Sequence, residues 1–242
     1  MKNHYVKTSN HRLFMAMLEG VETRAPREAR ILLLAGEPGT GKSRCVDNIG
    51  AERNAIHIEG VPGMTVAYLR DLLAYELGCQ GGTKFAQQKA IVDTFNQRHP
   101  TVILDEAQHG LASKADCIEY LRRICEQAGS VLILVCHASE KHRFGEHKLA
   151  HIATRISALV EFVPATFDDC QLYLKELCEV TVDAAIVQQA LTQSRGRYRL
   201  LSNAGRILED IAEAKGTATL TAADVKGVML CQDAMKSLRR GK

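Results

Sequence analysis

The stretch that most constrains the fold of this chain is Gly36-Glu37-Pro38-Gly39-Thr40-Gly41-Lys42-Ser43, which matches the phosphate-binding P-loop pattern G-x-x-x-x-G-K-[ST]. The apolar run 30–35 before it suits a buried parallel strand, and residues 41–52 after it can form a helix because they lack proline and keep helical apolar spacing. Backbone N–H groups of such a loop and the positive end of the helix dipole surround phosphates. The sequence therefore predicts a strand, a loop and a helix that bind a nucleoside triphosphate.

Within this loop, each polar side chain has an expected role. Lys42 is expected to reach the β and γ phosphates, and the Ser43 hydroxyl is expected to bind Mg²⁺. The predicted cofactors are therefore ATP and Mg²⁺. The predicted nucleotide-binding residues are Gly36, Glu37, Pro38, Gly39, Thr40, Gly41, Lys42, Ser43 and Arg44.

A second motif, Leu-Asp-Glu-Ala-Gln-His at 104–109, ends another apolar run. An acidic pair at the carboxyl end of a buried strand faces the crevice in which an open α/β sheet binds its ligands. We expect Asp105 to hold the hydration shell of Mg²⁺ and Glu106 to polarise the attacking water. The adjacent glutamate favours ATP hydrolysis over phosphoryl transfer to a small molecule.

Strands and helices alternate along most of the chain, which predicts an α/β fold with a five-stranded parallel sheet and helices on both faces. From Pro164 onward the pattern predicts helices alone, near 166–179, 182–193, 198–214 and 222–238. The predicted domains are an N-terminal extension with a short helix (1–29), an α/β ATPase domain (30–164) and a small helical lid domain (165–242). The predicted strands are 30–35, 55–59, 101–104, 131–135 and 158–162, with a short helix at 13–18 and further helices at 65–77, 83–97, 114–128 and 146–156.

Composition limits the possible partners and compartments. No apolar run is long enough to span a membrane, and no apolar segment near the start can act as a secretion signal, so we expect a cytoplasmic protein without a membrane partner. The net charge of +3 permits a local basic surface only. The eight cysteines contain no C-x-x-C pair, which favours buried free thiols over a metal site or disulfides. We expect His147 and His151 to be a solvent-facing pair.

Three further positions fit a nucleotide-hydrolysis scheme. His137 follows Cys136 at the end of the fourth strand, where it can touch the γ-phosphate or orient water, or cap the strand. Arg155 precedes the fifth strand, where it can neutralise transition-state charge in a neighbouring subunit. Arg199 opens a helix of the lid domain and can reach the γ-phosphate, with Arg197 as the competing choice.

The order of these motifs resembles that of an AAA+ ATPase over nearly the whole chain. Residues 36–43, 104–109 and 196–201 (Gly-x-x-Arg-Leu-Leu) are similar to those of the transposition ATPases, the group of the phage Mu B protein with its IstB-like and TnsC-like relatives. The resemblance implies a homo-oligomeric ring or filament on double-stranded DNA that delivers target DNA to a transposase and leaves the DNA on hydrolysis. With about thirty residues before the first strand, we expect no extra N-terminal helix-turn-helix domain.

Contacts to DNA carry no motif, so they are inferred from position in the predicted fold. In a filament, the inner surface comes from loops after the second strand and between the following helices. Two other functions stay open: a helicase loader or replication initiator, and a nucleotide-gated switch without a DNA role. The candidate DNA-binding residues are Met64, Thr65, Arg70, Thr83, Lys84 and Arg98.

Overall fold

The computed structural model describes residues 1–231 of the chain. Strand β1 (Ile31–Gly36) is buried along its whole length, and α2 (Lys42–Arg53) begins at the lysine of the P-loop. The predicted arrangement of strand, glycine loop and helix is therefore confirmed.

The five strands form one parallel sheet in the order β2-β3-β4-β1-β5, so the α/β fold class is confirmed. Because all strands run in the same direction, the segments that follow β1, β3 and β4 leave the sheet at the same edge. The other four strands are β2 (Ile56–Glu59), β3 (Val102–Asp105), β4 (Leu132–His137) and β5 (Ile156–Phe162).

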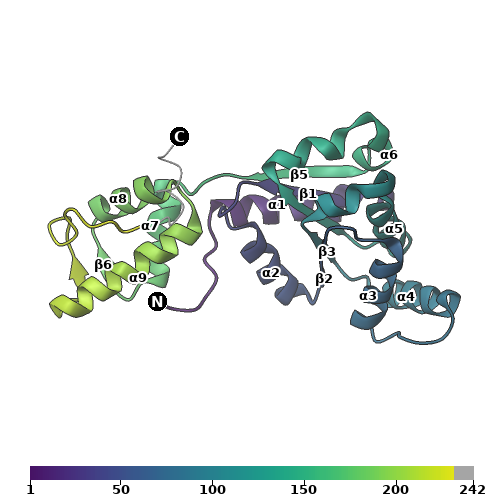
Figure 1. The fold of residues 1–242 in the computed structure, drawn as a ribbon, viewed down its shortest axis with the longest axis horizontal. Helices are drawn as coiled ribbons and strands as arrows, with labels where there is room; N and C mark the ends of the chain where they lie inside the picture. The colour runs from purple at the N-terminus through teal and green to yellow at the C-terminus, as the bar shows by residue number, and fades with distance from the viewer. Residues whose placement is uncertain (232–242) are drawn as a thin grey trace. The chain divides into compact units, whose positions relative to one another are not determined.

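Helices cover both faces of the sheet (Figure 1). Alternate residues of β1 face opposite layers, and Leu33 belongs to a core that includes side chains of α3 (Val66–Glu76), α4 (Lys84–Arg98) and α5 (Ala112–Ala128). On the other face α2 packs against Ile103, and Phe14 of α1 (Ser9–Arg24) lies edge-to-face with Phe162 of β5. Short segments complete the unit: η1 (Arg27–Ala29), η2 (Ala107–Leu111), η3 (Ala138–Gly145), η4 (His147–Leu149) and α6 (Ala150–Ala153).

The chain divides into two compact units. The first, here called the sheet unit, comprises residues 13–37 and 42–162; the second, here called the lid unit, comprises 1–12, 38–41 and the chain from Val163 on. The lid unit packs α7 (Phe167–Leu177), α8 (Ala184–Ser194) and α9 (Tyr198–Lys215) around its own apolar core. The residues predicted as an N-terminal extension are thus shared between the two units.

The prediction that no strand follows Pro164 is wrong. Two-residue strands β6 (Thr181–Val182) and β7 (Thr219–Leu220) pair in parallel within the lid unit. Strands this short have no visible period-2 pattern, so sequence periodicity does not reveal them.

The predicted helix at 222–238 is also wrong for the part that the structure describes, since 222–231 is turn and coil and 232–238 lies outside the described residues. Hydrogen bonds link Thr221 and Asp224 at the start of this segment: Thr221 N–H donates to Asp224 Oδ2 at 2.7 Å, and Asp224 N–H donates to the Thr221 carbonyl oxygen at 2.9 Å. The backbone after them is held by glutamine side chains of α8: Gln193 Oε1 accepts from the N–H groups of Leu230 and Cys231. A helix is not needed to satisfy those groups.

Two helix predictions near the sheet need correction in extent. The segment 146–156 contains only the four-residue α6, because Glu146 has extended backbone (φ −62°, ψ 142°) and β5 already begins at Ile156. Conversely, α1 is longer than the predicted 13–18, and buries Phe14, Leu18 and Val21 at helical spacing. None of the helices within residues 1–231 is both long and apolar enough to cross a membrane.

Candidate nucleotide-binding site

The P-loop has the backbone that phosphate binding requires. Gly39 and Gly41 adopt φ values of +86° and +91°, a region that residues with a Cβ rarely adopt. Lys42 Nζ donates to the carbonyl oxygens of Gly36 at 2.7 Å and Glu37 at 3.2 Å. Burial lowers the pKa of Lys42, whereas the nearby Asp105 and Glu106 carboxylates act to raise it. The Lys42 ammonium group therefore lies against the start of the P-loop and near both acidic residues. The next candidate, Arg44, is exposed in the first turn of α2.

Ser43 and Asp105, predicted to serve the same metal ion, lie together. The Ser43 side chain lies close enough to the Asp105 carboxylate to lower its pKa as a hydrogen-bond donor, although the two residues are 62 positions apart in the sequence. Burial raises the pKa of Asp105, and the hydrogen bonds from Glu106 N–H and Ser43 only partly oppose this effect. A hydroxyl and a partly desolvated carboxylate form a donor set that suits hydrated Mg²⁺. The residues present therefore fit the predicted metal.

Glu106 follows Asp105 in an unusual backbone conformation. Its φ of +50° is left-handed, and its N–H donates to Asp105 Oδ1 at 2.8 Å. Its side-chain Oε2 accepts a hydrogen bond from Gln108 Nε2 at 2.5 Å. Its carbonyl oxygen lies against Gly60, where a Cβ would approach it to 2.5 Å. Left-handed backbone in a residue with a side chain is found preferentially at functional sites.

The end of β4 brings His137 to the P-loop strand. His137 pairs with Gly36 in the sheet, and its Nε2 lies 3.4 Å from the Glu37 carboxylate. Its Nδ1 accepts from Ser139 N–H at 3.1 Å, so the neutral ring carries its proton on Nε2, toward Glu37. The preceding Cys136 is buried beside Lys42, and burial raises the pKa of its thiol to about 12. At this strand end, His137 is thus the polar group and Cys136 a neutral thiol.

The two candidate arginines of the lid unit differ in position. The stem of Arg197 packs on the P-loop, since a Cβ on Gly39 would lie 3.2 Å from Arg197 Cβ and 3.8 Å from its Cδ. The neighbouring Tyr198 N–H donates to the Gly39 carbonyl oxygen at 2.8 Å. Arg199 is exposed. Arg197, which the sequence analysis gave as the alternative to Arg199, is therefore the arginine that contacts the P-loop.

Arg155 lies at the opposite end of the sheet from the P-loop of its own chain. It precedes β5, whose first residue Ile156 pairs with Ile31 at the start of β1. A strand of six residues spans about 20 Å. Arg155 Nη1 donates to the Glu28 carbonyl oxygen at 3.2 Å and lies 3.8 Å from a Glu126 carboxylate oxygen.

Three residues that contribute to the site were missed by sequence reasoning. Asn10 is buried and its side-chain amide donates to the carbonyl oxygens of Thr40 in the P-loop, at 3.4 Å, and Val163, at 2.8 Å. Gly60 packs on the Asp105-Glu106 backbone, and Gln108 holds the Glu106 side chain. A glycine directly after a predicted strand is a usable signal of close backbone approach, whereas Asn10 and Gln108 carry no such signal.

The six candidate DNA-binding residues differ in how far their side chains are exposed to solvent. Met64 is a wrong choice, because it is buried in the core of the sheet unit with only 5% of its surface exposed. Arg70 is half-buried and pairs with Asp71 and Gln87. Thr65 and Thr83 use their side-chain oxygens as N-caps of α3 and α4.

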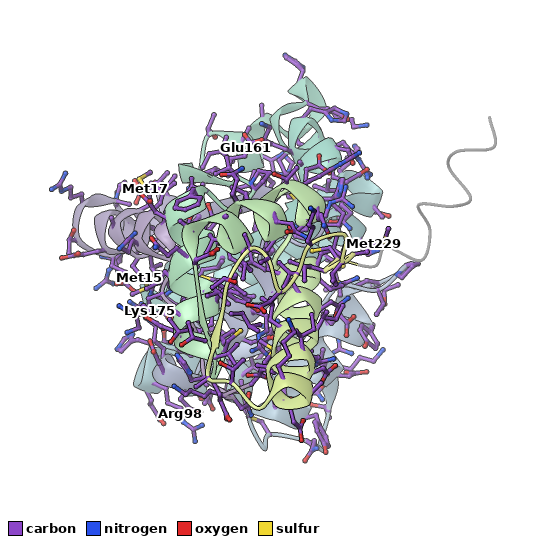
Figure 2. All side chains as sticks on the ribbon, turned by 90° about the vertical axis from the view of Figure 1, so that its left-hand side faces the viewer. Met15, Met17, Arg98, Glu161, Lys175 and Met229 are labelled. Atoms are coloured by element: carbon purple, nitrogen blue, oxygen red, sulfur yellow. The ribbon has the colours of Figure 1, made fainter. Side chains whose placement is uncertain are left out.

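Lys84 and Arg98 are exposed at the two ends of α4, and Figure 2 shows the Arg98 side chain extending away from its helix. Residues 80–86 form a run in which every residue is exposed, here called the α4 tip. It includes Phe85, an aromatic ring with 80% of its surface exposed that sequence reasoning did not select. From 77 to 92 the chain contains two lysines and no carboxylate.

Other candidate chemistry is absent from the part of the chain that the structure describes. His147 and His151 are both exposed, as predicted, and residues 1–231 hold no group of three or more metal-binding side chains. The eight cysteines are free, and all except Cys79 are buried. The prediction of buried free thiols is confirmed for seven of them.

A parallel sheet with a P-loop after β1 and an acidic pair after β3 defines a P-loop NTPase fold. Residues 24–144, half of the chain, match the family model described as "AAA domain". The chain belongs to this AAA family. A search of curated protein sequences finds no match.

Solved structures of archaeal and bacterial AAA+ proteins share the fold. Cdc6p from Pyrobaculum aerophilum is 17% identical with a TM-score of 0.64, covering 100% of this chain and 73% of that one. ORC2 from Aeropyrum pernix, in ADPNP-ADP complexes, is 15% identical with a TM-score of 0.64, covering 95% and 70%. RuvB from Thermotoga maritima, described as a Holliday junction branch migration motor, is 16% identical with a TM-score of 0.60, covering 93% and 69%. At sequence identities this low, the structural similarity shows that these proteins share a fold and shows nothing further about function.

Proposed function

We propose that the protein is an ATPase that assembles on duplex DNA in its ATP-bound state and leaves the DNA on hydrolysis. The observation that carries the ATPase proposal is the proximity of the Ser43 side chain to the Asp105 carboxylate, with Glu106 next to them in a left-handed conformation. The P-loop, the metal ligands and the candidate base then occupy one end of the sheet. A module that only binds phosphate, without hydrolysis, does not require a second carboxylate such as that of Glu106 beside the metal ligands.

In the proposed mechanism each side chain has one task. Lys42 binds the β and γ phosphates, while Ser43 and Asp105 would hold Mg²⁺, which would supply positive charge to neutralise the phosphate oxygens. Glu106 orients the attacking water and accepts its proton. His137 Nε2–H can donate to a γ-phosphate oxygen, and Arg197, with Arg199 as the alternative, binds phosphate from the lid unit.

Two variants test hydrolysis. Lys42→Ala should abolish ATP binding because it removes the ammonium group that binds the β and γ phosphates. Glu106→Gln should keep ATP binding and lower the turnover number by roughly 100-fold or more, as expected for loss of a general base. Equal turnover in wild type and Glu106→Gln would exclude the assigned base.

Arg155 is proposed to act on the nucleotide of a neighbouring subunit, since the sheet separates it from its own P-loop by about 20 Å. Subunits carrying Arg155→Ala have an intact P-loop, and subunits carrying Lys42→Ala have an intact arginine. If the site is shared, mixing the two variants should restore part of the ATPase activity that each lacks alone. Absence of any recovery on mixing would contradict a shared site.

The α4 tip is the proposed DNA contact. Its lysine can neutralise phosphate charge, and its exposed Phe85 offers an apolar surface to the sugars or bases. Electron microscopy of the protein with random-sequence duplex DNA tests assembly, with and without a non-hydrolysable ATP analogue. Rings or filaments that require both DNA and the analogue support the proposal, whereas particles that ignore DNA contradict it.

Delivery of target DNA to a transposase is the proposed role, and it rests on the resemblance to the transposition ATPases. A second candidate, a replication initiator or helicase loader, is favoured by the structural similarity to Cdc6p and the ORC proteins, one of which was solved in complex with DNA. Stimulation of strand transfer by a purified transposase encoded beside this chain would support the first role. Loading of a replicative helicase onto DNA would support the second.

A further inference from the structure

We propose that Gln108 is the positioning residue that holds the Glu106 carboxylate at the site of hydrolysis. This inference rests on the proposed ATPase function. It names a residue that the motifs assign no role, and it comes from the arrangement of the turn that follows β3.

The first observation is the contact itself. Gln108 Nε2 donates to Glu106 Oε2 at 2.5 Å. The amide orientation follows from charge, because the flipped amide would place its oxygen against a carboxylate oxygen. The bond engages one carboxylate oxygen of Glu106 and leaves the other to accept a proton from water.

The second observation concerns the oxygen atom of the Gln108 side-chain amide. Gln108 Oε1 is buried and has no hydrogen-bond partner within residues 1–231. A buried acceptor without a partner destabilises a fold, because the polar atom loses its hydrogen bonds to water and gains none in return. Within residues 1–231 the Gln108 side chain donates to the Glu106 carboxylate alone, and a locally unfavourable side chain of this kind is typical of a functional site.

The third observation is that the turn does not require the Gln108 side chain. The His109 N–H donates to the Glu106 carbonyl oxygen at 3.1 Å. Ala107 and Leu111 are buried in the core of the sheet unit, and Gly110 packs against Ile118. These backbone and apolar contacts can maintain η2 when residue 108 is changed.

The position of the held carboxylate fits its task. The Glu106 charge acts to raise the pKa of both Lys42 and Cys136, so the carboxylate lies near the lysine of the P-loop. A glutamate side chain has three rotatable bonds, and without a donor the carboxylate can turn toward solvent. The hydrogen bond from Gln108 therefore limits the conformations of the Glu106 side chain and keeps its carboxylate near Lys42.

The test compares ATPase kinetics of the full chain. Gln108→Met keeps the length of the side chain and removes its N–H donors, and Gln108→Ala serves as a second variant if the first does not fold. Either should lower kcat by about 10- to 100-fold, as for other residues that orient a reacting group, while KM for Mg-ATP stays within about 2-fold. Gln188→Ala, an exposed glutamine substitution in α8, should retain wild-type kinetics.

A double variant separates positioning from general loss of structure. In the Glu106→Gln background, Gln108→Met should cause no further loss of kcat, because the carboxylate that it positions is already absent. Additive losses, an unchanged kcat in Gln108→Met, or a rise in KM that accounts for the whole effect would each overturn the inference. A wild-type protein without ATPase activity would instead overturn the proposed function on which it rests.

Discussion

Gly60 lies directly against the backbone of Glu106: a Cβ at Gly60 would come within 2.5 Å of the Glu106 carbonyl oxygen and 2.9 Å of the Asp105 carbonyl oxygen. The Gly60 N–H donates to that same Asp105 oxygen at 2.8 Å. The end of β2 and the acidic pair after β3 therefore cannot move independently. A displacement of the loop that begins at Gly60 is transmitted to the candidate catalytic base.

Gly60→Ala should destabilise the protein and impair hydrolysis. Backbone atoms must shift to accommodate the methyl group, which costs about 1–3 kcal/mol, and the shift displaces Glu106. Denaturant unfolding and ATP turnover measure the two effects. Gly20→Ala is the matched control, since nothing lies within 4 Å of a Cβ there and alanine in a helix is favoured by roughly 0.5–1 kcal/mol. An unchanged free energy of unfolding for Gly60→Ala would contradict the close approach.

Asp105→Asn should stabilise the nucleotide-free protein while it removes Mg²⁺-dependent nucleotide binding. Burial raises the pKa of Asp105 above its ordinary value of 3.8, so the ionised carboxylate is less favourable in the folded state than in the unfolded state. The destabilisation is fully present above the raised pKa and disappears as the pH falls through it toward 3.8. The difference in Tm between variant and wild type should therefore shrink on acidification, and a difference that grows would contradict this sign.

Ser9→Ala should lower the stability of the lid unit. Asp169 is buried, and its carboxylate accepts from Ser9 N–H at 2.7 Å and from Ser9 Oγ at 2.5 Å. Loss of the hydroxyl removes a hydrogen bond to a charged group, worth about 1.5–3 kcal/mol. Thr23→Ala, which removes an exposed hydroxyl bonded to a carbonyl oxygen of its own helix, is the control in chemical unfolding.

The same carboxylate should contribute to acid sensitivity. Burial acts to raise the pKa of Asp169, but hydrogen bonds from Ser9 and Thr166 together outweigh burial and lower it below 3.8. Its stabilisation is present above 3.8 and is lost as the pH falls through the lowered pKa. Wild type should lose more stability than Asp169→Asn over this acidic range, as measured by Tm against pH. Parallel curves would contradict the lowered pKa.

Arg197 and Arg199 should differ in their effect on nucleotide binding. Arg197 packs on Gly39 of the P-loop, whereas Arg199 is exposed. Arg197→Ala should weaken ATP binding by about 10-fold or more, as expected for a charge-assisted contact worth 1.5–3 kcal/mol. Arg199→Ala should change the affinity by less than about 2-fold. Titration with a fluorescent ATP analogue measures the affinity of each variant. A larger loss of affinity in Arg199→Ala than in Arg197→Ala would indicate that Arg199 is the arginine that binds the nucleotide.

Lys84 and Phe85 should weaken DNA binding in different ways. Removal of one phosphate contact lowers the slope of log K against log salt by about 1, so Lys84→Ala should reduce this slope. Phe85→Ala should lower affinity at every salt concentration and leave the slope unchanged, because an apolar contact releases no counterions. Leu13→Ala, a substitution of another exposed apolar residue, is the control. Wild-type affinity in Phe85→Ala would remove this ring from the interface.

The sequence by itself determined the features that depend on neighbouring residues. The buried run before the P-loop, the glycines that take positive φ, and the helix that begins at Lys42 follow from local conformational preferences. The proximity of Ser43 and Asp105 was also predictable, because the carboxyl ends of parallel strands meet at one edge of a sheet. These rules need no knowledge of packing.

Only the tertiary structure decided the features that depend on distant side chains. Helical spacing at 222–238 predicted a helix, but within the described residues Gln189 and Gln193 of α8 satisfy the backbone there, as side chains that no local pattern reveals. Packing likewise buried Met64 and placed Arg197, rather than Arg199, on the P-loop. The contact of Gln108 with Glu106 depends on a left-handed backbone at residue 106, which is stable only because the surrounding fold maintains it.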